Sequence, residues 1–321
     1  MQGFSWTLVD PGGPPGRYHN PKVGGSSPSS GIGFSRAGWR LQMAEIDLHP
    51  GSVVLCATCG VEHAVASGTC EICADERQCL PPGGQVWTSL RELRRRGHRV
   101  AVAEREPELL SLVVTPEVGI GQHCFVVSTP QGSVIWDVPP FIDRPAVDRI
   151  HALGPVLAIV ASHPHTFGVQ SAWSHALGQA PILVCEPMLE WVRRPDAAIT
   201  PWRGSLELAS GLVLHELGGH FAGSSVLHWA AGAAGGGVLL SSDTIHGNPD
   251  GETVTFMRSY PNRIPLSAPV VARLAAMVAD LTFDRLYDNF GHGPSHGAAA
   301  AVERSAQRYV SWVRGDFDEL T

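Results

Sequence analysis

The order of the short strand-like runs constrains the fold of this sequence more than any other feature. These runs come in two batches, and helical patterns follow each batch. The first batch is Leu109–Thr115, Cys124–Thr129, Val134–Val138, Leu157–Ala161 and Ile182–Cys185, and the second is Leu206–Glu216, Val226–Trp229 and Gly237–Ser241. Because strands grouped in this way form sheets that helices cover, the sequence predicts an α/β (α+β) architecture of stacked sheets flanked by helices.

Four segments have the pattern of helices. In an Arg-rich segment from Trp87 to Arg99, Leu90 and Leu93 fall on one side, and the helix is expected to stop near Gly97. The other three predicted helices are Val169–Gly178, Val270–Leu286 and Ala298–Val313. The last two are amphipathic, so we expect them to cover a sheet.

Composition excludes several classes of protein. The chain has 321 residues, of which 44% are hydrophobic, so it can bury a full core. Its net charge of −7 argues against nucleic acid as the main partner. No charge-free apolar run reaches the ~20 residues that a membrane helix needs. The N-terminus also lacks the basic and apolar segments of a secretory signal, so we expect a cytoplasmic protein without a membrane partner.

The first 42 residues differ from the rest, because Gly, Pro and Ser dominate them and no periodicity is present. Two interpretations remain open: translation starts at Met43, or residues 1–42 are a disordered tail. The predicted organisation is therefore 1–42 disordered or not translated, 43–86 a cysteine-containing segment, and 87–321 the main domain.

Two Cys-x-x-Cys pairs lie in the second of these segments, with ten residues between them: Cys56, Cys59, Cys70 and Cys73. Four thiolates that converge from two tight turns are typical of a structural Zn²⁺ site, which leaves no position for water. An iron–sulfur or redox role and a site without metal are the alternatives. His63 is a possible substitute for one thiolate, whereas Cys79 fits neither pair.

A second group of candidate ligands follows the predicted strands. His163 and His165 come directly after Leu157–Ala161, and two imidazoles one residue apart in extended backbone can point to the same side. His220 lies in a Gly-rich turn, Asp243 ends the next strand, and His292 lies in the turn Gly291–Gly293.

The order His-x-His, Gly-His-x-x-Gly-Ser, strand-Asp and Gly-His-Gly resembles the metallo-β-lactamase fold superfamily over about residues 105–315. Val134–Asp137 looks like the early strand of that fold, which ends in Asp. The cysteine segment is similar to that of a hydrolase-like branch with an N-terminal zinc knuckle of four cysteines. The resemblance implies a four-layer αββα sandwich with the metal at the sheet edges.

The resemblance also implies roles for individual residues. His163, His165 and His220 correspond to a three-histidine metal site, Asp243 to the bridging carboxylate, and His292 to a ligand of a second metal. Phe167 and Gly168 stand where the superfamily usually has Asp and His of that second site. We therefore expect one metal ion in the active site. His296 is a weaker substitute ligand.

These roles suggest a metal-dependent hydrolase, in which metal-bound hydroxide attacks the carbonyl of a small ester, thioester or lactone. Asp243 would orient or deprotonate the water as the catalytic carboxylate. Asp137 would hold a ligand histidine in one tautomer. His228 and His246 would contact substrate or remain polar residues at the rim.

Zinc is the expected ion in both sites, one structural and one catalytic, and iron or manganese also suits the histidine site. Phe167 and Gly168 motivate an alternative, a catalytically silent member that acts as a binding or scaffold protein. An oxidoreductase with iron is a third interpretation, for which the sequence offers no redox partner. The sequence predicts no particular oligomeric state.

Overall fold

The structure is a computed structural model that describes residues 53–66 and 68–321. The segment 1–42 and the first residues of the predicted 43–86 segment lie outside the described residues, so both interpretations of 1–42 stay predictions. The described residues all belong to one unit, Ile46–Thr321.

The first large sheet has seven strands in the order β10-β9-β8-β7-β6-β5-β4. They are β4 (Arg99–Glu106), β5 (Leu109–Thr115), β6 (Cys124–Thr129), β7 (Gly132–Trp136), β8 (Val156–Val160), β9 (Ile182–Cys185) and β10 (Ile199–Trp202). Strands β4 to β7 are antiparallel, whereas β7 to β10 are parallel. Every residue of β7 and β9 is buried, as expected for strands covered on both faces.

The second large sheet has five strands in the order β11-β12-β13-β14-β19. They are β11 (Ser205–Ala209), β12 (Leu212–Glu216), β13 (Ser225–Trp229), β14 (Val238–Leu240) and β19 (Arg285–Tyr287). Strands β11 to β14 are antiparallel, and β19 is parallel to β14. The predicted strand pair within Leu206–Glu216 is the hairpin of β11 and β12.

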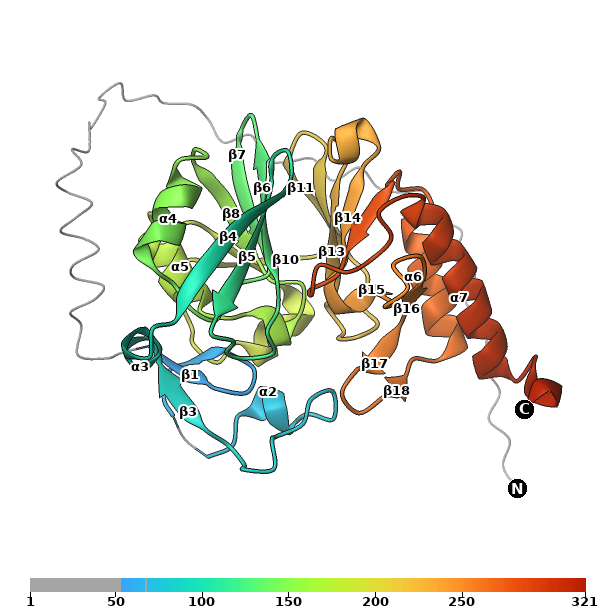
Figure 1. Ribbon diagram of the computed structural model, residues 1–321, viewed down its shortest axis with the longest axis horizontal. Helices are drawn as coiled ribbons and strands as arrows, with labels where there is room; N and C mark the ends of the chain where they lie inside the picture. The colour runs from blue at the N-terminus through green and yellow to red at the C-terminus, as the bar shows by residue number, and fades with distance from the viewer. Residues whose placement is uncertain (1–52, 67) are drawn as a thin grey trace, which may run out of the picture. The chain divides into compact units, whose positions relative to one another are not determined.

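Helices cover the outer side of each sheet (Figure 1). The helices α4 (Arg144–His151) and α5 (Gln170–Ala176) flank the seven-stranded sheet, and α6 (Ala268–Val278) and α7 (Ala298–Arg314) flank the five-stranded one. Leu239 and Leu286 of the second sheet belong to one buried cluster with Val271, Leu274 and Val302 of these helices. The four-layer αββα arrangement expected from the resemblance is confirmed.

The cysteine segment forms a small antiparallel sheet of its own, in the order β2-β1-β3. Its elements are β1 (Val54–Cys56), β2 (Glu62–His63), α2 (Glu71–Ala74) and β3 (Trp87–Ser89), and α3 (Leu90–Arg95) follows. This sheet thus extends across the predicted 86/87 boundary.

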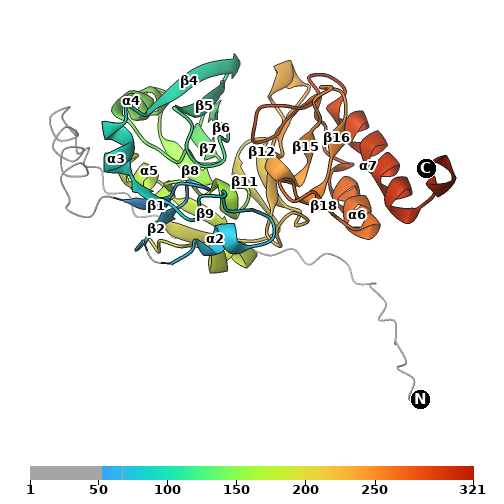
Figure 2. The same ribbon diagram turned by 60° about the horizontal axis from the view of Figure 1, so that its bottom comes forward.

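Short elements complete the fold. The strand pairs are β15 (His246–Gly247) with β16 (Val254–Thr255) and β17 (Met257–Ser259) with β18 (Ile264–Pro265). The 3-10 turns are η1 (Pro164–Thr166), η2 (Glu186–Trp191), η3 (Ala233–Gly235), η4 (Ser242–Thr244) and η5 (Asp318–Leu320). Figure 2 shows α2 near the lower edge of the molecule, on the same side as β1 and β2. Among the described helices, none combines the length and apolar character needed to cross a membrane.

Two predicted helices need correction. The helix expected from Trp87 begins only at Leu90, because Ser89 accepts a hydrogen bond from the Glu92 N–H and residues 87–89 pair with β1. The helix predicted for Val270–Leu286 is wrong beyond Val278, since Leu286 lies in β19 opposite Leu239. There, pairing with β14 overrides the apolar spacing that suggested a longer helix.

Strand β4 and helix α4 are among the elements that were not predicted. Strand β4 is mostly exposed, so it lacks the alternation by which strands are recognised. Helix α4 did have a signal, because Asp143 accepts from the Ala146 N–H and Pro145 stands in the first turn.

Candidate metal centre

Four candidate ligands meet where the two large sheets adjoin. His163 and His165 follow the end of β8, His220 lies between β12 and β13, and Asp243 lies in η4 after β14. The N–H of Ser225, at the start of β13, donates to the Ser162 carbonyl oxygen at 3.0 Å and so joins the sheets at this edge. The strand ends therefore bring together residues that are far apart in the sequence.

The turn that carries His220 depends on two glycines. Gly218 and Gly219 have φ values of +72° and +92°, which side chains disfavour. The turn is closed by the N–H of Gly218, which donates to the Ser224 carbonyl oxygen at 2.8 Å. This conformation directs His220 toward the histidines of the other sheet.

The ligand atoms of His163, His165, His220 and Asp243 all lie within 4.8 Å of one another, and all four side chains are buried. Asp243 Oδ2 is 3.3 Å from His163 Nε2 and 3.8 Å from His220 Nε2. Ligand atoms held tetrahedrally by Zn²⁺ at their usual bond lengths are about 3.4 Å apart. The spacing is therefore suitable for one metal ion.

The three histidines present unpaired nitrogens to this point. The Nε2 atoms of His163, His165 and His220 are buried and have no hydrogen-bond partner among the described residues. Leaving a buried polar atom unpaired costs about 1–3 kcal/mol, and native proteins rarely accept this three times in one place. The convergence of these atoms fits a metal ion.

The tautomer of His220 and the pKa values of His220 and His165 support this assignment. His220 Nδ1 lies 3.1 Å from the Met257 carbonyl oxygen, which only accepts, so Nδ1 carries the proton and Nε2 the lone pair. Burial lowers the pKa of His220 to about 4 and that of His165 well below its usual value. Both imidazoles are thus neutral near pH 7, as metal ligands must be.

The carboxyl group of Asp243, which adjoins these histidines, is ionised. Burial alone would raise the pKa of its carboxyl, but the neighbouring side chains of His163 and His246 outweigh burial and place the pKa well below its usual value. The cluster therefore combines the neutral imidazoles of His165 and His220 with His163 and one carboxylate.

Asp137 is connected to His163 through two hydroxyl groups. Asp137 Oδ1 accepts from Thr166 Oγ1 at 2.6 Å and from the Ser162 N–H at 2.8 Å. Ser162 Oγ lies 3.2 Å from Thr166 Oγ1 and 2.9 Å from His163 Nδ1. Because this chain ends on a carboxylate, the direction of donation runs from His163 Nδ1 to Asp137. The role expected for Asp137 stays a prediction, with Ser162 and Thr166 as intermediates.

The two candidate substrate-contacting histidines lie in different surroundings. His246 Nδ1 is 3.4 Å from Asp243 Oδ1 and 3.3 Å from Asp288 Oδ2. Burial would lower the pKa of His246, but its bond to Asp243 and the charge of Asp288 raise it overall. His228 instead lies on β13, where its Nε2 is 2.8 Å from the Thr282 carbonyl oxygen. Only His246 adjoins the four-residue cluster.

The residues at the positions associated with a second metal lie outside the four-residue cluster. The side chain of His292 is 64% exposed, and its Nδ1 lies 3.9 Å from Asp288 Oδ2, outside the four-residue cluster. His296 pairs with Asp284 at 3.2 Å. Phe167 is buried, and a side chain at Gly168 would overlap the carbonyl oxygen of Val138.

Sequence reasoning missed three residues beside the cluster. Asp288 directly follows β19, but that signal was hidden because the strand was predicted as helix. Tyr260 donates to the Asp243 carbonyl oxygen at 3.1 Å. The guanidinium carbon of Arg77 lies 3.8 Å from the ring centre of Phe221, the residue after His220. No sequence signal indicated Tyr260 or Arg77, because tertiary packing alone brings them to the site.

The four predicted cysteines also form a cluster. Cys56, Cys59, Cys70 and Cys73 are buried, and their sulfur atoms lie within 4.8 Å of one another. The Sγ atoms of Cys56 and Cys73 are 3.7 Å apart, and those of Cys59 and Cys70 are 3.8 Å apart. Tetrahedral Zn²⁺–thiolate geometry separates sulfur atoms by about 3.8 Å. All four are free thiols, so the cluster fits a metal and not disulfides.

His63 lies beside this cluster and outside the four-sulfur group. Its Nε2 is 3.4 Å from Cys70 Sγ, and its ring packs edge-on against Trp87. A hydrogen bond shared with Cys59 lowers the pKa of Cys56 to about 6. Hydrogen bonds among the four thiols also lower the pKa of Cys70 and raise those of Cys59 and Cys73. Thiolates are thus favoured at two of the four positions.

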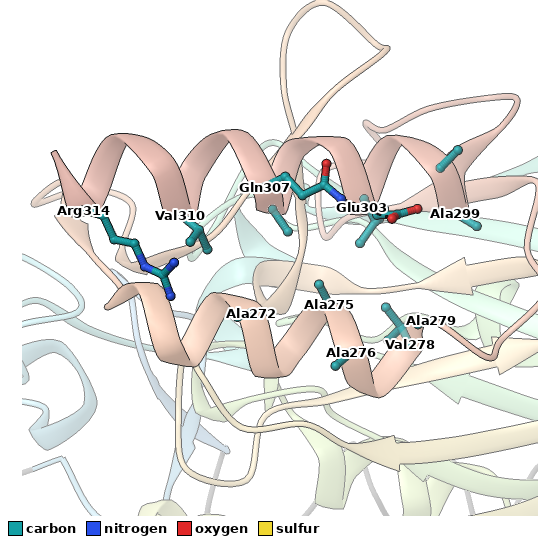
Figure 3. Close-up of a pocket in the computed structure, with 13 residues that line it drawn as sticks. Ala272, Ala275, Ala276, Val278, Ala279, Ala299, Glu303, Gln307, Val310 and Arg314 are labelled. Atoms are coloured by element: carbon teal, nitrogen blue, oxygen red, sulfur yellow. Dashed lines mark hydrogen bonds between the residues drawn. The ribbon is translucent and has the colours of Figure 1, made fainter. Parts of the chain in front are cut away.

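A separate groove of about 560 Å³ lies between α6 and α7 (Figure 3). Alanines such as Ala272, Ala275 and Ala299 line it, with Glu303 and Arg314 among its charged residues. None of the predicted site residues takes part, so the groove is distinct from both clusters.

Comparison with known proteins gives one close relative in sequence and several in structure. No family model matches the chain. The uncharacterized protein YmaE of Bacillus subtilis (strain 168) is 42% identical over 267 residues, which cover 82% of this chain and 97% of YmaE.

Among solved structures, the metallo-β-lactamase DIM-1 matches 67% of this chain and 98% of its own, with 13% identity and a TM-score of 0.49. The metallo-β-lactamase SMB-1, in a complex with mercaptoacetic acid, matches 65% and 94%, with 17% identity and a TM-score of 0.44. Because these TM-scores are below 0.5, the fold assignment depends on the strand order and the αββα layers described above. The chain has the metallo-β-lactamase fold, and it belongs to the same family as YmaE of Bacillus subtilis.

Proposed function

We propose that this protein is a metal-dependent hydrolase that cleaves a small ester, thioester or lactone. The observation that carries the proposal is the convergence of three buried, unpaired Nε2 atoms and one ionised carboxylate on a single point. Such an arrangement does not stabilise a structural core, since each unpaired nitrogen costs folding free energy.

His163, His165 and His220 would hold one metal ion, with Asp243 beside it. A Zn²⁺ ion bound by three imidazoles lowers the pKa of water to about 7 and polarises a carbonyl group. Iron and manganese also accept such ligands. The second-site positions hold Phe167 and Gly168, and His292 lies outside the cluster, so we propose a mononuclear site.

Asp243 would act on the attacking water. Its Oδ2 faces the histidines, whereas Oδ1 points toward His246 at 3.4 Å. Because its carboxyl is held ionised, Asp243 accepts a hydrogen bond from water and fixes its orientation. His246 lies between Asp243 and Asp288 and would provide a route by which a proton leaves the site.

The cysteine cluster would hold a structural zinc ion. Its four sulfur atoms would occupy all four positions of a tetrahedral ion and leave none open to water. Its location in the small β2-β1-β3 sheet suggests that the ion stabilises this segment, which has little core of its own.

The experiment that tests this proposal measures metal content and hydrolysis together. Protein expressed from Met43 and purified without chelators should contain about two zinc ions per chain. The Cys73→Ser variant should retain one, and the wild type should hydrolyse at least one class in a panel of esters, thioesters and lactones.

The alternative is a silent member of the fold, favoured by the replacement of the second-site ligands. It predicts one zinc ion in the wild type, which is lost in Cys73→Ser, and no hydrolysis. That result would contradict the hydrolase proposal.

A further inference from the structure

Arg77 and the histidines of the cluster all pack against the ring of Phe221. Its guanidinium carbon is 3.8 Å from the ring centre of Phe221. The same ring lies 5.1 Å from His220, 5.2 Å from His165 and 5.8 Å from His163, measured between ring centres. Arg77 therefore brings a positive charge from the cysteine segment to the edge of the candidate active site.

The backbone around Arg77 is fixed by the β17–β18 hairpin. Ser259 Oγ donates to the Arg77 carbonyl oxygen at 3.1 Å, and Asn262 Nδ2 donates to the carbonyl oxygens of Glu76 and Gln78 at 2.8 and 3.1 Å. The same hairpin carries Tyr260, which is bonded to the backbone of Asp243. This arrangement holds Arg77 in a preorganised position relative to the site.

The charge of Arg77 is only partly compensated. Its side chain is 11% exposed, and Asp75, the carboxylate within ion-pair distance in the described part of the chain, lies 2.9 Å from Nε. Burial lowers the pKa of the guanidinium, and the charges of Asp75, Glu76 and Glu190 only partly oppose this shift. A guanidinium has five N–H donors, so Asp75 leaves terminal donors for another acceptor.

We propose that Arg77 binds a carboxylate of the substrate, and this inference rests on the proposed function. A guanidinium pairs with a planar carboxylate through two parallel hydrogen bonds. Because Asp75 already offsets part of the charge, Arg77 suits a monoanion better than a doubly charged phosphate. The substrate is therefore an ester, thioester or lactone with a carboxylate near the scissile carbonyl.

The inference can be tested by binding two matched thiols to the zinc-loaded protein in isothermal titration calorimetry. Both 3-mercaptopropionate and 3-mercapto-1-propanol supply a thiolate for zinc, but only the first has a carboxylate. The wild type should bind the carboxylate about 10-fold more tightly or better, as expected for a charge-assisted pair. Arg77→Met should abolish this preference while the affinity for the alcohol remains.

Two further variants separate binding from structure. Arg258→Met removes a nearby, more exposed cation that pairs with Glu76, so it should keep the preference. Arg77→Lys should keep part of it, and a zinc content of two ions shows that each variant folds.

Each outcome decides the inference. Equal binding of both thiols by the wild type, or a preference that survives in Arg77→Met, overturns the role of Arg77 and leaves the hydrolase proposal intact. If neither thiol binds the wild type, the histidine site holds no accessible metal, and the proposed function falls together with the inference.

Discussion

The main-chain N–H of Glu62 donates a hydrogen bond of 2.9 Å to the carbonyl oxygen of Gly168. Glu62 belongs to the cysteine-bearing sheet, and Gly168 occupies the position at which the superfamily resemblance would place a second-site histidine. The cysteine segment thus packs directly against the backbone where that ligand is missing.

Gly168→Ala should destabilise the protein by clearly more than about 1 kcal/mol. Gly168 has a φ of +50°, and a Cβ atom there would lie 2.8 Å from the Pro139 carbonyl oxygen and overlap that of Val138. Gly204→Ala is the matched control, since Gly204 has a φ of +69° and nothing within 4 Å of the added atom. Urea unfolding should show a larger loss for Gly168→Ala, and equal losses would contradict the steric argument.

His165→Ala should remove the metal of the histidine site and the hydrolytic activity while the fold persists. The variant deletes one of the three converging Nε2 donors and leaves the cysteine cluster unchanged. Elemental analysis should show a loss of one ion per chain. His228→Ala serves as the control because His228 bonds to Thr282, so it should retain both ions. Full metal content in His165→Ala would disprove the ligand assignment.

Asp137→Asn should weaken metal binding at the histidine site by roughly 10- to 100-fold. The substitution keeps the shape but removes the carboxylate that accepts from Thr166 and, through Ser162, orients His163. Competition with a chelator measures the affinity. Asp148→Asn, on the exposed ion pair with Arg144, should have no effect. An unchanged affinity in Asp137→Asn would leave Asp137 with a purely structural role.

Glu62 should make the stability depend on pH. Burial raises its pKa from 4.5 to about 7. The folded state therefore retains a proton that the unfolded state releases between these values. The contribution of Glu62 to stability is thus highest below pH 4.5 and is lost as the pH rises through 7. This shift in the pKa of Glu62 corresponds to a change of about 3 kcal/mol in the free energy of unfolding.

Glu62→Gln should remove this component, because an amide does not titrate and its oxygen can still accept from the Ser171 N–H. The melting temperature of the variant, relative to the wild type, should rise from about pH 5 to about pH 8, the range that brackets the raised pKa. A difference that does not vary with pH would show that Glu62 is not the group responsible.

The αββα fold and the candidate cluster could be predicted because each element of the pattern is local. His163, His165 and Asp243 each come directly after a short apolar strand, and strand ends in such sheets meet at one edge. The cysteine cluster could be predicted for the same reason, because the two cysteines of each pair are close together in the sequence. The local sequence was sufficient to predict a site residue wherever the neighbouring strand positions its side chain.

The rest depends on tertiary contacts. Arg77 reaches the site only because the β17–β18 hairpin holds its backbone, and nothing in its neighbourhood in the sequence signals this. Asp288 was missed because the residues before it were assigned to a helix, whereas pairing with β14 makes them a strand. Strand pairing between residues far apart in the sequence produces no periodic pattern in the local sequence.

The two clusters differ in how much of the chain must be in place before they exist. The cysteine ligands all lie within residues 56–73, so a short stretch of nascent chain can capture an ion early. The histidine site draws His163 and His165 from one large sheet and His220 and Asp243 from the other, and the Ser225–Ser162 hydrogen bond closes the junction. Because these sheets must dock first, we expect the cysteine site to form before the histidine site during synthesis.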